Sequence, residues 1–169
     1  MSKLLIITAS NGENLKLAKR FSDAATAMGH QATVLDLTEL ELPLFTPRIK
    51  ANGLPAGLMD LQQVLQDSPR WVICTPEYNG SIPPVFTSAI AWLSILGDDF
   101  RTLFNGRPIA MASHSGSGGY EVLTALRIQL AHLGAHVVGR QLVANQSKPA
   151  HDSSIEAILQ ALGKLPSAD

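Results

Sequence analysis

Short apolar runs that alternate with longer amphipathic segments are the feature that most constrains the fold of this chain. The first run, residues 3–8, is apolar without alternation, as expected of a strand covered on both faces. Residues 13–28 carry apolar side chains at three- and four-residue spacing, which predicts a helix with one buried face. Gly29 then offers the positive φ with which many helices end. Repeated along a chain, this pattern predicts parallel strands joined by helical crossovers.

The pattern recurs to the end of the chain and predicts an α/β fold. Right-handed crossovers favour a flavodoxin-like, doubly wound, five-stranded parallel sheet with strand order 2-1-3-4-5. We expect strands at residues 3–8, 31–36, 71–75, 108–113 and 136–139, with an extension of the last to Val143 as an alternative. We expect helices at residues 13–28, 56–66, 83–96, 121–133 and 153–163, and a long loop with Pro43, Pro47, Gly53 and Pro55 before the second helix.

Length, charge and cysteine content limit the classes of function. At 169 residues the chain is expected to form one domain, residues 1–169, and its hydrophobic fraction of 46% allows a full core with some apolar surface, as in an oligomer. A net charge of -1 without a basic run argues against nucleic acid and anionic membranes as partners. One cysteine forms no intramolecular disulfide, and the first apolar run is too short to span a bilayer, so we expect a cytoplasmic protein.

Three predicted loops lie where such sheets bind ligands, at the carboxyl ends of the strands near the switch point. Residues 9–14 place small hydroxyl and amide side chains before a helix, where free backbone N–H groups and the helix dipole attract an anion such as phosphate. The alternative is that Ser10 or Asn11 simply caps that helix. The residues alone do not separate these two interpretations.

The loop T-P-E-Y-N-G-S at residues 75–81 is the strongest candidate of the three. Asn79-Gly80 predicts a tight turn, which would present backbone N–H groups and the Tyr78 ring to a planar heterocycle. An ordinary strand-to-helix connection is the alternative. Residues 113–120 contain three glycines and three serines, which permit close approach of a ligand to the backbone but equally suit a flexible connector.

Other reactive side chains are expected to be structural. Cys74 lies in a predicted buried strand, and the isolated histidines lack metal-ligand spacing, so we expect no metal site. No Ser-His-Asp order or pair of carboxylates predicts a catalytic side chain. The helix at residues 83–96 has an apolar face around Trp92 that is either core or a subunit contact, and this face favours a dimer over a monomer.

The loop and helix at residues 75–94 resemble the signature of the NADPH-dependent FMN reductase family, which includes quinone, chromate and azo-dye reductases. The resemblance rests on T-P-E-Y-N-G-S-I-P at residues 75–83, followed by Ala89-Ile90 and Trp92-Leu93-Ser94. It extends over nearly the whole chain, since later segments match the family's entry to the fourth strand and its glycine loop.

The resemblance implies FMN at the strand ends, NADPH or NADH as electron donor, and a homodimer or homotetramer. The cofactor-binding residues that it implies are Ser10 and Asn14 at the phosphate, and Pro76, Glu77, Tyr78, Asn79, Gly80, Ser113 and Gly116 around the isoalloxazine ring.

The first loop departs from the family pattern, which commonly reads G-S-x-R-x-x-S-x-N. Only three residues separate Ser10 from Asn14, and the arginine is missing. Loss of a bidentate arginine–phosphate contact costs on the order of 2 kcal/mol, about thirtyfold in affinity. We therefore expect FMN to bind weakly, or as a substrate rather than a resident cofactor.

The sequence thus predicts an NAD(P)H-dependent, FMN-using oxidoreductase in which the cofactor carries the chemistry and no side chain is catalytic. Its small-molecule electron acceptor would be a quinone, an azo compound, a metal oxyanion or free flavin. A non-enzymatic flavin-binding electron carrier and a flavin-free interaction domain remain as alternatives. The choice between NADH and NADPH also stays open, with Arg48 and Lys50 in the long loop as candidate contacts for a 2′-phosphate.

Overall fold

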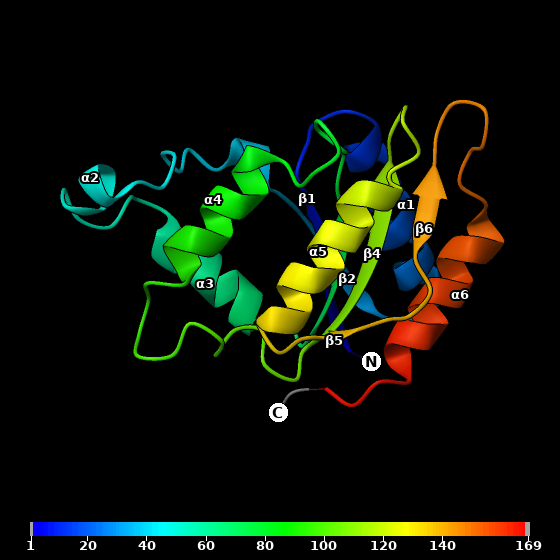
Figure 1. The fold of residues 1–169 in the computed structure, drawn as a ribbon. Coiled ribbons are helices and arrows are strands. Elements are labelled where there is room, and N and C mark those ends of the chain that lie inside the picture. The colour runs from blue at the N-terminus through cyan, green and yellow to red at the C-terminus, as the bar shows by residue number, and fades with distance from the viewer. Residues whose placement is uncertain (1, 168–169) are drawn as a thin grey trace.

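The computed structural model describes residues 2–167 and contains one parallel sheet with helices on both faces (Figure 1). The strands are β1 (Lys3–Thr8), β2 (Gln31–Asp36), β3 (Arg70–Cys74), β4 (Pro108–His114), β5 (His136–Val137) and β6 (Leu142–Ala144). The helices are α1 (Glu13–Ala27), η1 (Leu37–Glu39), α2 (Pro47–Lys50), α3 (Leu58–Gln66), α4 (Pro84–Leu93), α5 (Tyr120–His132) and α6 (Asp152–Gly163).

The strand order is β2-β1-β3-β4-β5, which confirms the predicted flavodoxin-like topology. Thr8 in β1 pairs with Cys74 in β3, and Cys74 pairs with Ala112 in β4. The carboxyl ends of these three central strands therefore lie level with one another. The loops that follow them leave the sheet side by side, at the edge where doubly wound sheets bind ligands.

Two apolar layers cover the sheet and explain its uninterrupted apolar strands. Helices α3, α4 and α5 lie on one side of the sheet, and α1 and α6 lie on the other (Figure 1). Leu5 and Ile7 pack with residues of the first group, and Leu4 and Ile6 pack with residues of the second. Because every second residue of β1 enters a different layer, both sets must be apolar. No helix within residues 2–167 is both long and apolar enough to cross a bilayer.

The predicted last strand is two short strands. β5 pairs with the start of β4 and β6 with its end, so the five-stranded prediction becomes a six-stranded sheet with the same order. The backbone leaves the sheet between them. Arg127 Nη2 donates to the carbonyl oxygen of Val138 and to Oε1 of Gln141, both at 3.0 Å, and so joins α5 to both ends of this break.

The predicted long loop before the second helix is wrong in detail, since it contains η1 and α2. Asp36 Oδ1 accepts from Thr38 N at 2.8 Å, and Thr46 Oγ1 accepts from Ile49 N at 3.1 Å, so each short helix has a side-chain cap. Pro47 occupies the first helical position of α2, where its missing N–H costs nothing. The other elements begin and end within three residues of their predicted bounds.

Trp92 is fully buried within the chain. Its Nε1 donates to the carbonyl oxygen of Pro43 at 2.7 Å, and its ring meets Phe45 edge-on with 5.0 Å between the ring centroids. The apolar helix face that could have been core or a subunit contact is therefore core. It no longer supports a dimer.

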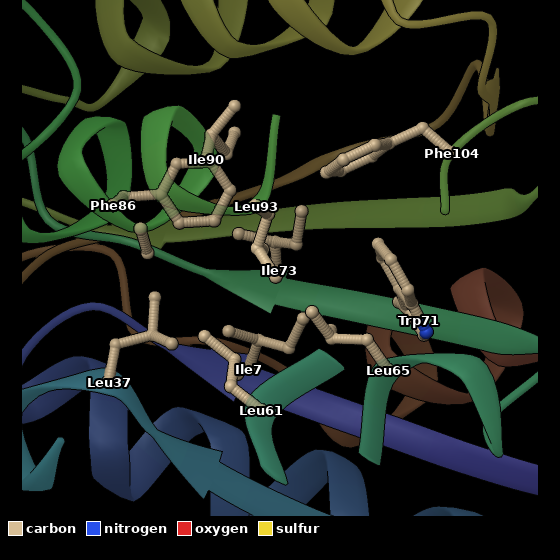
Figure 2. Close-up of a pocket in the computed structure, with 11 residues that line it drawn as sticks. Ile7, Leu37, Leu61, Leu65, Trp71, Ile73, Phe86, Ile90, Leu93 and Phe104 are labelled. Atoms are coloured by element: carbon tan, nitrogen blue, oxygen red, sulfur yellow. The ribbon is translucent and has the colours of Figure 1, made fainter. Parts of the chain in front are cut away.

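A small apolar cavity lies in the core between the sheet and helices α3 and α4 (Figure 2). Its volume of about 20 Å³ leaves room for roughly one water molecule. Ile7, Leu61, Ile73 and Phe86 are among the apolar side chains that line it (Figure 2). A void this small without polar groups in its wall is a packing defect and not a ligand site.

Candidate functional site

Asn14 joins the first and third candidate loops. Its Nδ2 donates to the carbonyl oxygen of His114, and its Oδ1 accepts from His114 N, both at 2.9 Å. The side chain is only 2% exposed. Loop 9–14 is therefore anchored to the carboxyl end of β4, and both polar atoms of the Asn14 amide are committed to this anchor.

The first turn of α1 has no side-chain cap. Gly12 occupies the N-cap position, so neither Ser10 nor Asn11 satisfies the first N–H groups of the helix. Ser10 is half-buried, and its carbonyl oxygen accepts from Thr8 Oγ1 at 2.8 Å. Glu13 pairs with Lys16 Nζ at 2.6 Å, and this cation lowers the pKa of the exposed carboxyl. The turn retains the free donors that an anion requires.

The predicted tight turn after β3 is confirmed. Tyr78 and Ser81 exchange two backbone hydrogen bonds, of 3.1 and 3.0 Å, around Asn79 (φ 51°) and Gly80 (φ 70°). Two successive positive φ angles define a type I′ turn, for which Asn-Gly is the preferred sequence. Tyr78 is 49% exposed beside it. The turn therefore presents an accessible ring and backbone donors at the edge of the sheet.

Glu77 connects this turn with the glycine loop, a role that the sequence analysis missed. One carboxylate oxygen accepts from Ser117 Oγ, and the other accepts from the backbone N–H of Val122 in the first turn of α5 at 3.2 Å. The hydrogen bond from Ser117, together with the donors of the helix, lowers the pKa of the Glu77 carboxyl despite its partial burial. Glu77 thus caps α5 from another segment, and its negative charge suits the positive end of the helix dipole.

Ser113 and Gly116 lie at different depths of the glycine loop. Ser113 is fully buried, and its Oγ has no hydrogen-bond partner within residues 2–167. Gly119 packs directly above it, because a Cβ atom at Gly119 would lie 2.6 Å from that Oγ. Gly116 is exposed, with open space where a Cβ would stand. Of the two predicted ring contacts, only Gly116 is at the surface.

Burial raises the pKa of the Cys74 thiol far above its ordinary value, so the thiolate is not formed near neutral pH. Within residues 2–167, no three His, Cys, Asp or Glu side chains gather closely enough to hold a metal ion.

The Glu77 contact predicts a pH-dependent protection of the start of α5. Since the folded-state pKa of Glu77 is lowered, the contact is fully present above the ordinary glutamate pKa of about 4.3 and is lost as the pH falls through the folded value. We expect Glu77→Gln to lower the amide-exchange protection factor of Val122 about fivefold at pH 7. Exchange followed by NMR, normalised to unfolded-chain rates at each pH, measures both effects.

The exposed Glu156 in α6 provides the matched control, because Glu156→Gln removes the same charge elsewhere. That variant should leave Val122 unchanged. Equal protection of Val122 in wild type and Glu77→Gln would show that the carboxylate does not hold the two loops together.

Comparison with known proteins identifies the family. A family model described as NADPH-dependent FMN reductase matches residues 2–149, most of the chain. The chain belongs to the NADPH-dependent FMN reductase family. It is accordingly an oxidoreductase that uses FMN and NAD(P)H, as the loop at residues 75–83 predicted. Membership leaves no reason to retain the non-enzymatic carrier or the interaction domain.

The following relatives share only a modest part of their sequence with this chain. A quinone reductase of Escherichia coli K12 is 32% identical over 103 residues, which cover 59% of this chain and 53% of the relative. An NADPH azoreductase of Bacillus sp. OY1-2 is 25% identical over 146 residues, which cover 83% of this chain and 75% of the relative. The alignment with the E. coli enzyme thus spans about half the length of that relative.

Solved structures support the fold. The NAD(P)H:acceptor oxidoreductase FerB from Paracoccus denitrificans superposes with a TM-score of 0.77 at 19% identity, and the match covers 99% of this chain and all of that one. An apo structure of the NADH:FMN oxidoreductase EMOB gives a TM-score of 0.74, also at 19% identity, with coverage of 99% and 92%.

Proposed function

We propose that this reductase binds FMN across the three loops at the carboxyl ends of β1, β3 and β4. The observation that carries the proposal is their convergence: the uncapped first turn of α1, the type I′ turn at residues 78–81 and the exposed Gly116 lie at one edge of the sheet. These groups fit a phosphorylated planar cofactor, since the helix offers N–H donors to a phosphate and the other two segments leave a ring open access.

The phosphate would bind the backbone N–H groups of the first turn of α1, together with Ser10. We assign Asn14 a positioning role, because both polar atoms of its amide already contact His114. Without an arginine in this loop, the phosphate gains no bidentate charged contact. FMN is therefore expected to dissociate more readily than a cofactor whose phosphate is bound by an arginine.

The ring would lie over Pro76, Tyr78 and the Asn79-Gly80 turn. FMN supplies the hydride-transfer chemistry when bound. The chain contributes the flat face of Tyr78, and the turn contributes backbone N–H groups that stabilise negative charge on a bound ring. Glu77 and Ser117 position the turn against the glycine loop. No titratable side chain is assigned a catalytic proton transfer.

Quinones and azo compounds are the electron acceptors that we propose, since relatives are named for each. Both are flat and conjugated, which suits an open ring surface; a metal oxyanion and free flavin are secondary candidates.

We also propose a cytoplasmic homodimer. Exposed apolar side chains such as Leu44 (65%) and Ile128 (67%) support a partner surface, now that Trp92 is assigned to the core.

The proposal is tested by titrating freshly purified protein with FMN and by following NADPH oxidation with added FMN and menadione. We expect saturable FMN binding and quinone-dependent turnover. Tyr78→Ala should weaken FMN binding about tenfold, because an aromatic contact contributes roughly 0.5–1.5 kcal/mol beyond the area that it buries. Quenching of FMN fluorescence measures the affinity.

Phe100→Ala is the matched control, because Phe100 is also an exposed ring, 40% accessible, and lies outside the three loops. That variant should bind FMN as the wild type does. Absence of both FMN binding and NAD(P)H oxidation in the wild type would contradict the proposed function.

A further inference from the structure

A groove outside the three loops lies along β6, the strand that ends the sheet next to β4. Residues 140–143 in and just before the strand line it, together with residues 148–151, Ser154 in the first turn of α6 and Tyr120 at the start of α5. Its volume is about 170 Å³, roughly ten times the 10–15 Å³ that a cavity needs to hold one water molecule. The groove is large enough to hold a polar group much larger than a water molecule.

The lining of this β6 groove is basic. Arg140, Lys148 and His151 contribute to it and no Asp or Glu does. Residues 138–151 contain no acidic residue, in a chain whose net charge is -1. Within residues 2–167, neither Arg140 nor Lys148 has a carboxylate within ion-pair distance, whereas the nearby Asp152 is paired with Arg20 at 2.6 Å. The two exposed cations are thus available to an anion.

Both cations stand on a fixed backbone. Asn145 Oδ1 accepts from Lys148 N and from Ser147 Oγ, both at 2.8 Å, and Asn145 N donates to the carbonyl oxygen of Lys148 at 2.9 Å. Arg140 follows the pair Val138-Gly139, and Arg127 donates to the carbonyl oxygens of both residues. A backbone that is already ordered reduces the entropy lost when an anion binds.

The β6 groove is next to the proposed FMN site. Val143, which lines the groove, pairs with Ser113 in the strand register, and Tyr120 directly follows the last glycine of the glycine loop. Tyr120 is 57% exposed, so its ring is accessible to a second planar group. A ligand that reaches from the FMN site over the end of β4 would meet an aromatic ring beside two cations.

We propose that the β6 groove binds the adenosine 2′-phosphate end of NADPH, with Arg140 and Lys148 at the phosphate and Tyr120 against the adenine. This inference rests on the proposed function, because the nicotinamide end of the same molecule would have to reach the proposed FMN site. Arginine favours this chemistry because its planar fork matches phosphate oxygens. Two free cations on a weakly acidic chain suit a single phosphate group and not a polyanion.

The competing candidates for the 2′-phosphate, Arg48 and Lys50, lie in α2. That helix lies at the side of the molecule opposite β6 (Figure 1). Both side chains are exposed, as Arg140 and Lys148 are. The double variants Arg48→Ala/Lys50→Ala and Arg140→Ala/Lys148→Ala therefore remove equal charge from two different places and form a matched pair.

Calorimetric titration of the full chain with adenosine 2′,5′-bisphosphate and with adenosine 5′-monophosphate tests the groove without turnover, because the ligands differ only by the 2′-phosphate. We expect the wild type to prefer the bisphosphate by on the order of tenfold or more. Arg140→Ala/Lys148→Ala should abolish this preference, and Arg48→Ala/Lys50→Ala should retain it. In turnover, the ratio of kcat/KM for NADPH to that for NADH should fall about tenfold in the first variant only.

The inference is overturned if the wild type shows no preference for the bisphosphate, if the preference survives in Arg140→Ala/Lys148→Ala, or if it disappears in Arg48→Ala/Lys50→Ala instead. Failure of the proposed function has a different signature: the wild type would neither bind FMN nor oxidise NAD(P)H, whatever the titrations with the two nucleotides give.

Discussion

Gly119→Ala is expected to lower the free energy of unfolding by about 3 kcal/mol. A Cβ atom at this position would lie 2.6 Å from Ser113 Oγ and 2.8 Å from Ser113 Cβ, well inside van der Waals contact. Ser113 is fully buried in β4. The backbone at Gly119 also has a φ of +78°, which costs a residue with a side chain roughly 1–2 kcal/mol. Overpacking adds about 1–3 kcal/mol.

Urea unfolding followed by far-ultraviolet circular dichroism measures this loss. Gly163→Ala is the control, because Gly163 lies in α6 with open space around a Cβ atom and no positive φ, so alanine should stabilise the helix slightly. Combining Gly119→Ala with Ser113→Gly should recover the overpacking part only. A Gly119→Ala protein as stable as the Gly163→Ala control would show that Gly119 does not pack on Ser113.

Arg107→Ala is expected to cost about 3 kcal/mol of stability for a different reason. The side chain is 7% exposed, and its Nε and Nη1 donate to the carbonyl oxygens of Leu103 and Ser68. The guanidinium carbon lies 4.6 Å from the centre of the Trp71 ring. Burial lowers the pKa of Arg107 while it has no carboxylate partner within residues 2–167. Two charge-assisted bonds and one ring contact together outweigh the relief of desolvation.

The conservative variant Arg107→Lys separates charge from shape, since lysine retains the charge but not the planar fork that reaches two carbonyl groups. We expect Arg107→Lys to lower the free energy of unfolding by about 2 kcal/mol. Arg101 provides the control, because it lies 5.0 Å over the ring of Phe100 in an exposed position, so Arg101→Ala should change stability by less than about 0.5 kcal/mol. Thermal unfolding of the three variants gives the comparison. Equal losses of stability in Arg101→Ala and Arg107→Ala would show that the buried contacts of Arg107 do not stabilise the fold.

The order of strands was predictable because burial on both faces leaves a plain signal in the sequence. Strands such as residues 4–7 must be apolar throughout, and right-handed crossovers then reduce the possible topologies to a few. The short helices η1 and α2 were missed because their signals are single caps, Asp36 and Thr46, and not a periodicity. The break at residues 138–141 is bridged by Arg127, which lies eleven residues or more before the groups to which it donates, so no local pattern marks it.

The loops of the candidate site were predictable from strand ends and turn residues, but the contacts between them were not. Asn79-Gly80 encodes its turn locally, through two positive φ angles. Glu77 instead finds its partner Val122 at a separation of 45 residues, and Asn14 finds His114 at a separation of 100. No local pattern records such pairs. The FMN and NAD(P)H prediction came from resemblance, and the assignment of individual residues to them stays a prediction.

The interruption between β5 and β6 also bears on how the protein behaves at high concentration. A sheet that ends in a long straight strand offers its free backbone groups to a neighbouring molecule, which is a common first step in aggregation. Here that side of the sheet ends in pieces of two and three residues, separated by backbone whose carbonyl groups Arg127 occupies. Such a border gives an incoming strand too short a template for stable pairing, so this side of the molecule is protected against edge-to-edge association.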